Sequence, residues 1–154
     1  MKSLNFLEID KIVDSLQDFV GARLQKIQSL PNGICMEFYK SEVHRLLIDL
    51  NPQCPLILPL SPQSRPVFAK AKTPSFLFLH AHATGMTLKT IERIQDLGRV
   101  VRINFEEGLS IEVRLFPHGQ NLLVNFGSKK ISWNKPKELE LLDGESLNKN
   151  LYSR

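Results

Sequence analysis

The amino-acid sequence predicts an α+β protein with a two-sheet, sandwich- or barrel-like β body, an N-terminal helix and a second helix near residues 74–84. Three observations predict this fold. An amphipathic segment with helical spacing opens the chain, several short segments alternate apolar and polar residues, and turn-forming residues separate these segments at regular intervals. The length of 154 residues fits a single domain with its own core.

The first helix is predicted over residues 6–20. Its apolar residues recur at spacings of three and four, as expected for a helix with one face on a core. Asn5 or Ser3 can cap its N-terminus, and Gly21 can end it.

The hydrophobic period then changes from helical to alternating. Three strand candidates follow: ARLQKIQSL, ICMEFYK and VHRLLIDL. Asn32-Gly33 predicts a type I′ turn between the first two. The next segment, QCPLILPLSPQSRPVF, is too rich in proline for a helix or a central strand, so we expect a short edge strand and then an exposed loop.

The second helix is predicted to start at Pro74, with Thr73 as its cap and Gly85 at its end. On a helix, His80 and His82 point about 200° apart and cannot share a metal ion. On a strand they would point the same way, but no third ligand lies nearby in the sequence. We therefore expect no metal and no cofactor.

Five further strand candidates complete the β body. They are TLKTIERIQ, RVVRINFE, SIEVRLF, NLLVNFG and KKISW. The sequence becomes polar after Trp133, so residues 1–137 are predicted as the domain and residues 138–154 as a polar tail or the start of a linker.

Charge and hydropathy narrow the class of protein. No apolar run approaches the roughly 20 residues of a membrane span, and acidic residues interrupt the N-terminal apolar positions, unlike in a signal peptide. We expect a cytoplasmic protein in which Cys35 and Cys54 stay reduced, although the two could pair.

Between Arg65 and Asn104 there are seven Lys and Arg residues and two acidic ones. Such an excess suits phosphate binding, although a solvated face is the commoner explanation for a cluster of charges.

Four segments, in order, resemble the N-terminal domain of the NFACT family, also called fibronectin-binding protein A-like. They are the opening helix with VGARLQKIQSLPNGICMEFY, then PSFLFLHAHATGMTL, DLGRVVRINFE and FPHGQNLLV. The resemblance covers about residues 5–137. It implies a fold like the N-terminal domain of formamidopyrimidine-DNA glycosylases.

The resemblance also implies a function. It predicts a non-enzymatic RNA-binding module that contacts tRNA and the large ribosomal subunit in ribosome-associated quality control, with no small-molecule substrate. His82 takes the place of the family's His, His80 falls on its Arg-Lys pair, and Arg99 is the remaining half of its Asp-Arg pair. Further cations and one amide complete the candidate RNA-binding residues: Arg99, His82, His80, Arg102, Lys70, Lys72 and Asn121. Each also has an ordinary structural explanation as a solvated or half-buried side chain.

The resemblance also implies that the family promotes tRNA-templated tail addition to stalled peptides. The sequence departs from the family where Gly98 replaces the Asp and His80-Ala81 replaces Arg-Lys, so tail addition is not expected from the resemblance alone. Two alternatives to the RNA-binding module remain. One is an extracellular-matrix (fibronectin) binding protein, suggested by the family's older name. The other is a DNA-glycosylase-like domain without catalysis, because the chain starts Met1-Lys2-Ser3 where those enzymes use Pro-Glu.

Overall fold

The computed structural model describes residues 4–70 and 72–134; the predicted boundary at residues 137–138 lies outside them. Two antiparallel sheets form the body, each with its strands in sequence order. One has four strands: β1 (Arg23–Leu30), β2 (Gly33–Lys40), β3 (Glu42–Asp49) and β4 (Leu56–Leu60). The other has five: β5 (Leu88–Arg93), β6 (Val100–Phe105), β7 (Leu109–Arg114), β8 (Asn121–Phe126) and β9 (Lys129–Ser132). The predicted α+β fold is confirmed, with a strand in each predicted segment.

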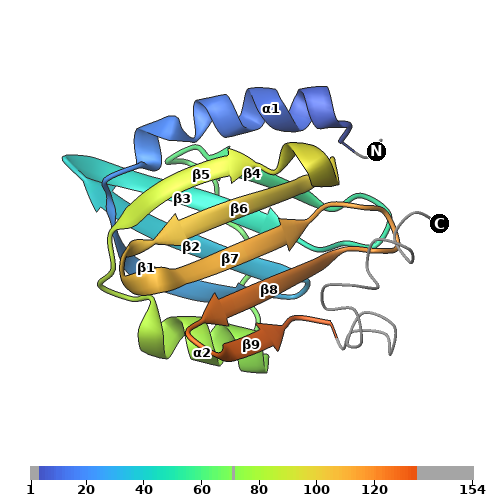
Figure 1. The fold of residues 1–154 in the computed structure, drawn as a ribbon. Coiled ribbons are helices and arrows are strands. Elements are labelled where there is room, and N and C mark those ends of the chain that lie inside the picture. The colour runs from blue at the N-terminus through green and yellow to red at the C-terminus, as the bar shows by residue number, and fades with distance from the viewer. Residues whose placement is uncertain (1–3, 71, 135–154) are drawn as a thin grey trace.

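The core lies between the two sheets, which are stacked one in front of the other in Figure 1. Alternate residues of each strand point inward, as in the row Ile27, Met36 and Leu46 across β1, β2 and β3. Phe38 of one sheet stacks on Phe105 of the other, with ring centroids 6.1 Å apart. This alternation is the pattern that made the strands predictable.

Helix α1 (Phe6–Ser15) packs against β4 and β5 and closes one open side of the sandwich (Figure 1). Asn5 caps it through a capping box with Glu8. The helix ends five residues earlier than predicted, and a 3₁₀ turn, η1 (Gln17–Phe19), follows. The Gln17 side chain donates to the Ile91 carbonyl oxygen at 3.0 Å and to the Val13 carbonyl oxygen of α1 at 3.1 Å, which ties this turn to both β5 and the helix.

Helix α2 (Pro74–His82) closes the opposite side, against β1, β8 and β9 (Figure 1). The predicted cap is confirmed, because the Thr73 hydroxyl accepts the Phe76 N–H at 3.2 Å. The second predicted helix is therefore present, with its last regular residue at His82. Neither helix among the described residues is long and apolar enough to cross a membrane.

The first hairpin differs from its prediction. Leu30 pairs with Gly33, so Pro31 and Asn32 are the two loop residues, and neither Asn32 nor Gly33 has the positive φ that a type I′ turn requires. The glycine serves another purpose. A Cβ at Gly33 would lie 1.9 Å from the Ile48 carbonyl oxygen, so the close approach of β3 excludes a side chain there.

The proline-rich segment forms a strap, defined here as residues 61–70, on the outer face of the four-stranded sheet. It leaves β4, the edge strand beside α1, and reaches β1, the edge strand beside α2. The outward-facing Arg45 donates to the carbonyl oxygens of Ser61 and Ser64, both at 2.8 Å. At the other edge the Ala69 N–H donates to the Ser29 carbonyl oxygen at 2.8 Å. The predicted edge strand and exposed loop are confirmed, and the loop is held at both edges.

Candidate nucleic-acid interface

The strap and α2 belong to a segment of unusual charge. The sequence holds no Asp or Glu between Asp49 and Glu92. Lys70 and Lys72 precede α2 and are both exposed, as are His80 and His82 near its end. Basic groups are thus presented here without acidic neighbours in the same stretch of chain.

One side of α2 carries a basic and aromatic series. The Lys72 ammonium lies 5.8 Å from the centroid of the Phe76 ring, and that ring lies 5.9 Å from the ring of His80. Phe76 is buried, whereas Lys72 and His80 are exposed. The spacing of four residues places Phe76 and His80 on one face of α2, and the cation–π contact holds Lys72, which precedes the helix, near the same ring.

A second ring cluster joins α2 to the five-stranded sheet. The His82 ring lies 4.2 Å from Phe78 and 5.6 Å from Phe126 of β8, measured between centroids. Phe78 and Phe126 are themselves 6.2 Å apart in an edge-on arrangement. His80 and His82 therefore have different neighbours, as their helical separation implies. No three His, Cys, Asp or Glu side chains in residues 4–70 and 72–134 are placed to hold a metal ion.

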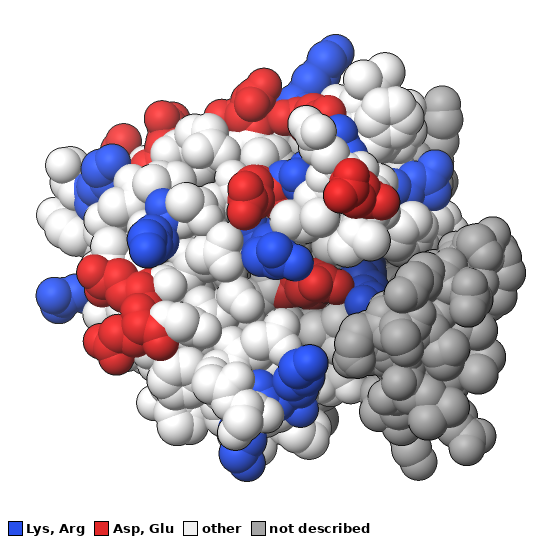
Figure 2. Space-filling model, viewed as in Figure 1, with Lys and Arg blue, Asp and Glu red and all other residues white. Residues whose placement is uncertain are grey.

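The β8–β9 hairpin adds two lysines that the sequence analysis missed. Lys129 pairs with Phe126 in the strand register, and Lys130 follows it; both are exposed. Only the fold brings β9 against α2, so no local pattern could identify these lysines. Figure 2 shows blue side chains over the β8, β9 and α2 region with no red among them, whereas both signs mix above. We call the set Lys72, His80, His82, Lys129 and Lys130 the α2–β9 surface.

Arg99 lies away from that surface. Arg99 precedes β6, and its carbonyl oxygen accepts the Leu115 N–H. The far end of β6 is Phe105, which lies in the same row across the sheet as Leu109 and Phe126. Six residues of strand separate the two ends, or about 20 Å. Arg99 is half-buried, and within the described part of the chain its side chain has no ion pair. The structure thus does not bring Arg99 and the histidines into one site.

Arg102 is engaged on the outer face of the five-stranded sheet. Its guanidinium lies 3.6 Å from the Glu112 carboxylate, which also pairs with Arg114 at 3.0 Å. Glu92 stands opposite Arg102 on β5. Acidic groups therefore surround this cation.

Asn121, another predicted site residue, is buried, with 5% of its surface exposed. Its side-chain oxygen accepts the N–H groups of Leu122 at 2.8 Å and Asn134 at 2.9 Å. Its amide nitrogen donates to the Asn134 carbonyl oxygen at 3.4 Å. Asn121 thus holds the chain after β9 against the start of β8.

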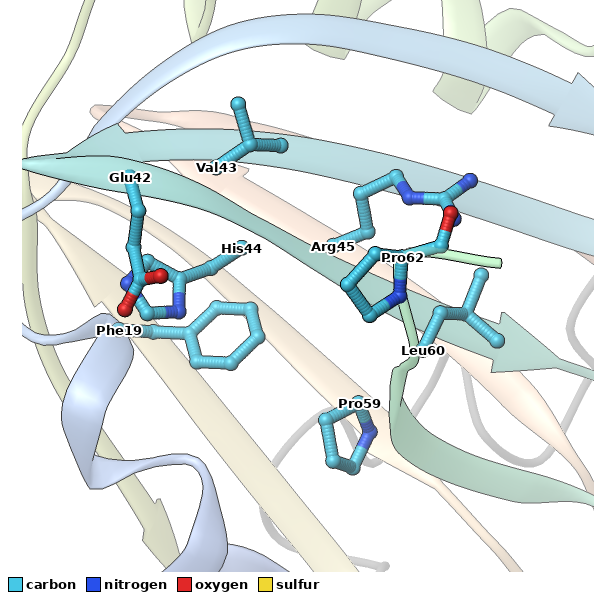
Figure 3. Close-up of a pocket in the computed structure, with 8 residues that line it drawn as sticks. All are labelled: Phe19, Glu42, Val43, His44, Arg45, Pro59, Leu60 and Pro62. Atoms are coloured by element: carbon cyan, nitrogen blue, oxygen red, sulfur yellow. The ribbon is translucent and has the colours of Figure 1, made fainter. Parts of the chain in front are cut away.

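A pocket of about 440 Å³ lies on the other side of the molecule, where η1 meets β3 and β4 (Figure 3). In Figure 3 the Glu42 carboxylate and the His44 ring lie beside Phe19, and the Arg45 guanidinium turns toward Pro62. Arg45 is already bonded to the strap carbonyls. The pocket therefore offers a carboxylate and apolar walls, which do not suit a phosphate.

Comparison with protein-family models and with curated proteins finds no match. Solved structures do match in fold. The N-terminal domain of fibronectin-binding protein PavA from Streptococcus pneumoniae is 19% identical with a TM-score of 0.74, over 88% of this chain and 58% of that one. The fibrinogen-binding protein from Staphylococcus aureus is 19% identical with a TM-score of 0.69, over 86% and 51%. The N-terminal part of the fibronectin/fibrinogen-binding protein from Streptococcus suis is 16% identical with a TM-score of 0.72, over 86% and 52%.

The chain therefore spans between 51% and 58% of the length of these three structures. Identity this low shows the fold alone. The implied likeness to formamidopyrimidine-DNA glycosylases stays a prediction. What the comparisons establish is that this chain has a fold found in these fibronectin- and fibrinogen-binding proteins.

Proposed function

We propose that this domain is a non-enzymatic RNA-binding module that contacts tRNA and the large ribosomal subunit in ribosome-associated quality control, in the cytoplasm. One observation carries the proposal. The strap and helix α2 contain basic residues and no Asp or Glu, and the fold places Lys129 and Lys130 of β9 beside the helix. The NFACT resemblance of the sequence supports the same function.

The physical argument starts from phosphate. Lysines that neutralise phosphates release condensed counterions, so affinity falls steeply as salt rises. The candidates include four exposed lysines: Lys70, Lys72, Lys129 and Lys130. Four such contacts give a slope of log affinity against log salt of about −3, or roughly a 50-fold loss between ~50 and ~200 mM salt.

The ring clusters suit RNA in particular. Structured RNA is recognised through its backbone and shape, while unpaired bases stack on aromatic and histidine rings. Exposed His80 and His82, each against a phenylalanine, offer such rings among the lysines. Arg99 would be a separate contact about 20 Å away, within reach of a large folded RNA.

The proposal is one of binding, because the candidate residues on α2 and β9 are exposed cations and rings that can contact phosphates and bases.

The test is a titration of labelled tRNA with the purified chain at ~50 and ~200 mM salt. The double variant Lys129→Ala/Lys130→Ala should bind at least about tenfold more weakly at low salt, because two phosphate contacts are lost. Lys11→Ala is the matched control, since Lys11 is an exposed lysine on α1, across the molecule from α2. A tRNA affinity that does not change with salt would count against the proposal. So would equal losses of affinity in Lys129→Ala/Lys130→Ala and in Lys11→Ala.

Binding of fibronectin or fibrinogen is the second candidate. It is favoured by the similar solved structures, which are named for binding those proteins. Saturable binding of this chain to immobilised fibronectin or fibrinogen, unaffected by Lys129→Ala/Lys130→Ala, would favour it. Absence of such binding beside salt-sensitive tRNA binding would favour the RNA module.

A further inference from the structure

The strap presents two adjacent apolar side chains to solvent. Val67 is 75% exposed and Phe68 is 47% exposed. Single exposed apolar residues are common on any protein. These two differ in their setting, because Arg65 and Lys70 flank them, both exposed, and the whole strap lacks acidic residues.

Phe68 is exposed on a segment that is held in place. The next residue, Ala69, donates its N–H to the Ser29 carbonyl oxygen of β1 at 2.8 Å. On the other side of the strap, Arg45 binds the carbonyl oxygens of Ser61 and Ser64. The backbone on either side of Phe68 is therefore anchored to the sheet. A ring whose backbone is anchored needs little ordering when a ligand covers it.

The charges around Phe68 indicate the ligand. Lys70 lies two residues after it, and Lys72 follows, positioned over the Phe76 ring at the start of α2. An aromatic ring among cations is how proteins bind single-stranded nucleic acid, because a base stacks on the ring while the cations contact phosphates. This arrangement requires no sequence-specific hydrogen bonds.

The same surface is a poor match for a lipid membrane. An amphipathic helix binds at a membrane interface through a broad apolar face. The exposed residues of α2 after Leu77 are His80, Ala81 and His82, so α2 presents no such face. We infer that the strap is a binding site for unpaired nucleotides, with Phe68 as the platform on which a base stacks. This inference rests on the proposed RNA-binding function and names the form of RNA bound beside α2.

The experiment compares two labelled RNAs, an unstructured single strand of about 12 nucleotides and a blunt duplex of the same length. Phe68→Ala should weaken binding of the single strand about tenfold, because one stacked base is lost, and change duplex binding less than about twofold. Tyr39→Ala is the matched control, since Tyr39 is an exposed aromatic residue outside the acid-free segment. It should leave both affinities unchanged.

Phe68→Trp keeps the test decisive if the alanine variant unfolds. The tryptophan should retain single-strand affinity, and its fluorescence should be quenched when a base stacks on it. Trp133, the one tryptophan of the natural sequence, directly follows β9, so the fluorescence change of the natural protein with the same RNA is the background to subtract. No quenching by a single strand that binds would overturn the inference.

The remaining outcomes separate the inference from the function on which it rests. If both RNAs bind with equal affinity and Phe68→Ala changes neither affinity, the inference is overturned but the proposed RNA-binding function is not. Failure to bind either RNA at low salt removes both. Binding to phosphatidylserine vesicles that Phe68→Ala abolishes, with RNA affinity unchanged, assigns the strap to membranes and overturns the inference.

Discussion

His82 of α2 packs on Phe126 of β8, with ring centroids 5.6 Å apart. This contact joins the second helix to the hairpin that carries Lys129 and Lys130. The basic groups of two distant chain segments share one surface because of this ring cluster, which Phe78 completes.

Phe126→Ala should therefore lower the free energy of unfolding by about 2 kcal/mol, because a half-buried ring and its aromatic partners are lost. Urea denaturation measures the change. Phe126→Leu, which keeps most of the apolar area, should cost less than half as much. Equal costs for the two variants would contradict this expectation, because the whole loss would then come from the aromatic contacts, which both variants lack.

Arg93 belongs to the cation-rich stretch of the sequence but has a structural role. Its guanidinium binds both oxygens of Asp10 on α1, donates to the Gly98 carbonyl oxygen at 3.1 Å and lies over the Phe6 ring. We expect Arg93→Ala to destabilise the protein by roughly 2 kcal/mol, because Arg93 is largely buried and joins α1 to the sheet. Affinity for tRNA per folded molecule should not change. A loss of affinity without a loss of stability would contradict this assignment.

Arg99 and Arg102 should behave differently although both flank or lie within β6. Arg99→Ala should weaken tRNA binding by roughly 1–2 kcal/mol with an unchanged melting temperature, because Arg99 has no ion pair within residues 4–70 and 72–134. Arg102→Ala should leave tRNA affinity nearly unchanged, since Glu112 offsets its charge. The two titrations, each with a melting curve, separate a binding cation from a paired one. Equal losses of affinity would show that the ion pair with Glu112 does not keep Arg102 from contacting RNA.

Asp49 gives a pH-dependent prediction. Burial raises the pKa of its carboxyl, and the Asn51 N–H that donates to it at 3.1 Å partly offsets the effect. The native state then holds the proton more tightly than the unfolded state, so the contribution of Asp49 to stability falls as pH rises through the unfolded and then the native pKa. Asp49→Asn keeps an oxygen acceptor and removes the charge. It should melt at a higher temperature than the natural protein at neutral pH and equally in strong acid; a lower melting temperature at neutral pH would contradict this.

Much of the fold could be predicted from local patterns. Alternation and turn residues located the strands, and Thr73 with Pro74 located the start of α2, because these signals act within a few residues. The break after Ser15 could not be predicted, since it depends on Gln17 reaching the carbonyl oxygen of Ile91, which is distant in sequence. The first turn was mispredicted because Gly33 serves the approach of β3.

The candidate site was less predictable than the fold. The two histidines and the nearby lysines share a segment with α2, and local reading found them. Lys129 and Lys130 lie beside α2 only because of sheet order, and Arg99 lies far from it for the same reason. Asn121 is polar, so its sequence suggests a side chain available for binding RNA. In the structure that side chain is hydrogen-bonded to the backbone of Asn134.

The most direct measurement is photo-crosslinking of 4-thiouridine-labelled tRNA to the chain, followed by mass spectrometry of the crosslinked peptides. If RNA binds at the α2–β9 surface and the strap, crosslinks should form in the strap, α2 and the β8–β9 hairpin, and fewer should form as salt rises. Crosslinks confined to α1 or to β2 and β3, or no crosslinks at low salt, would contradict the RNA-binding surface described here.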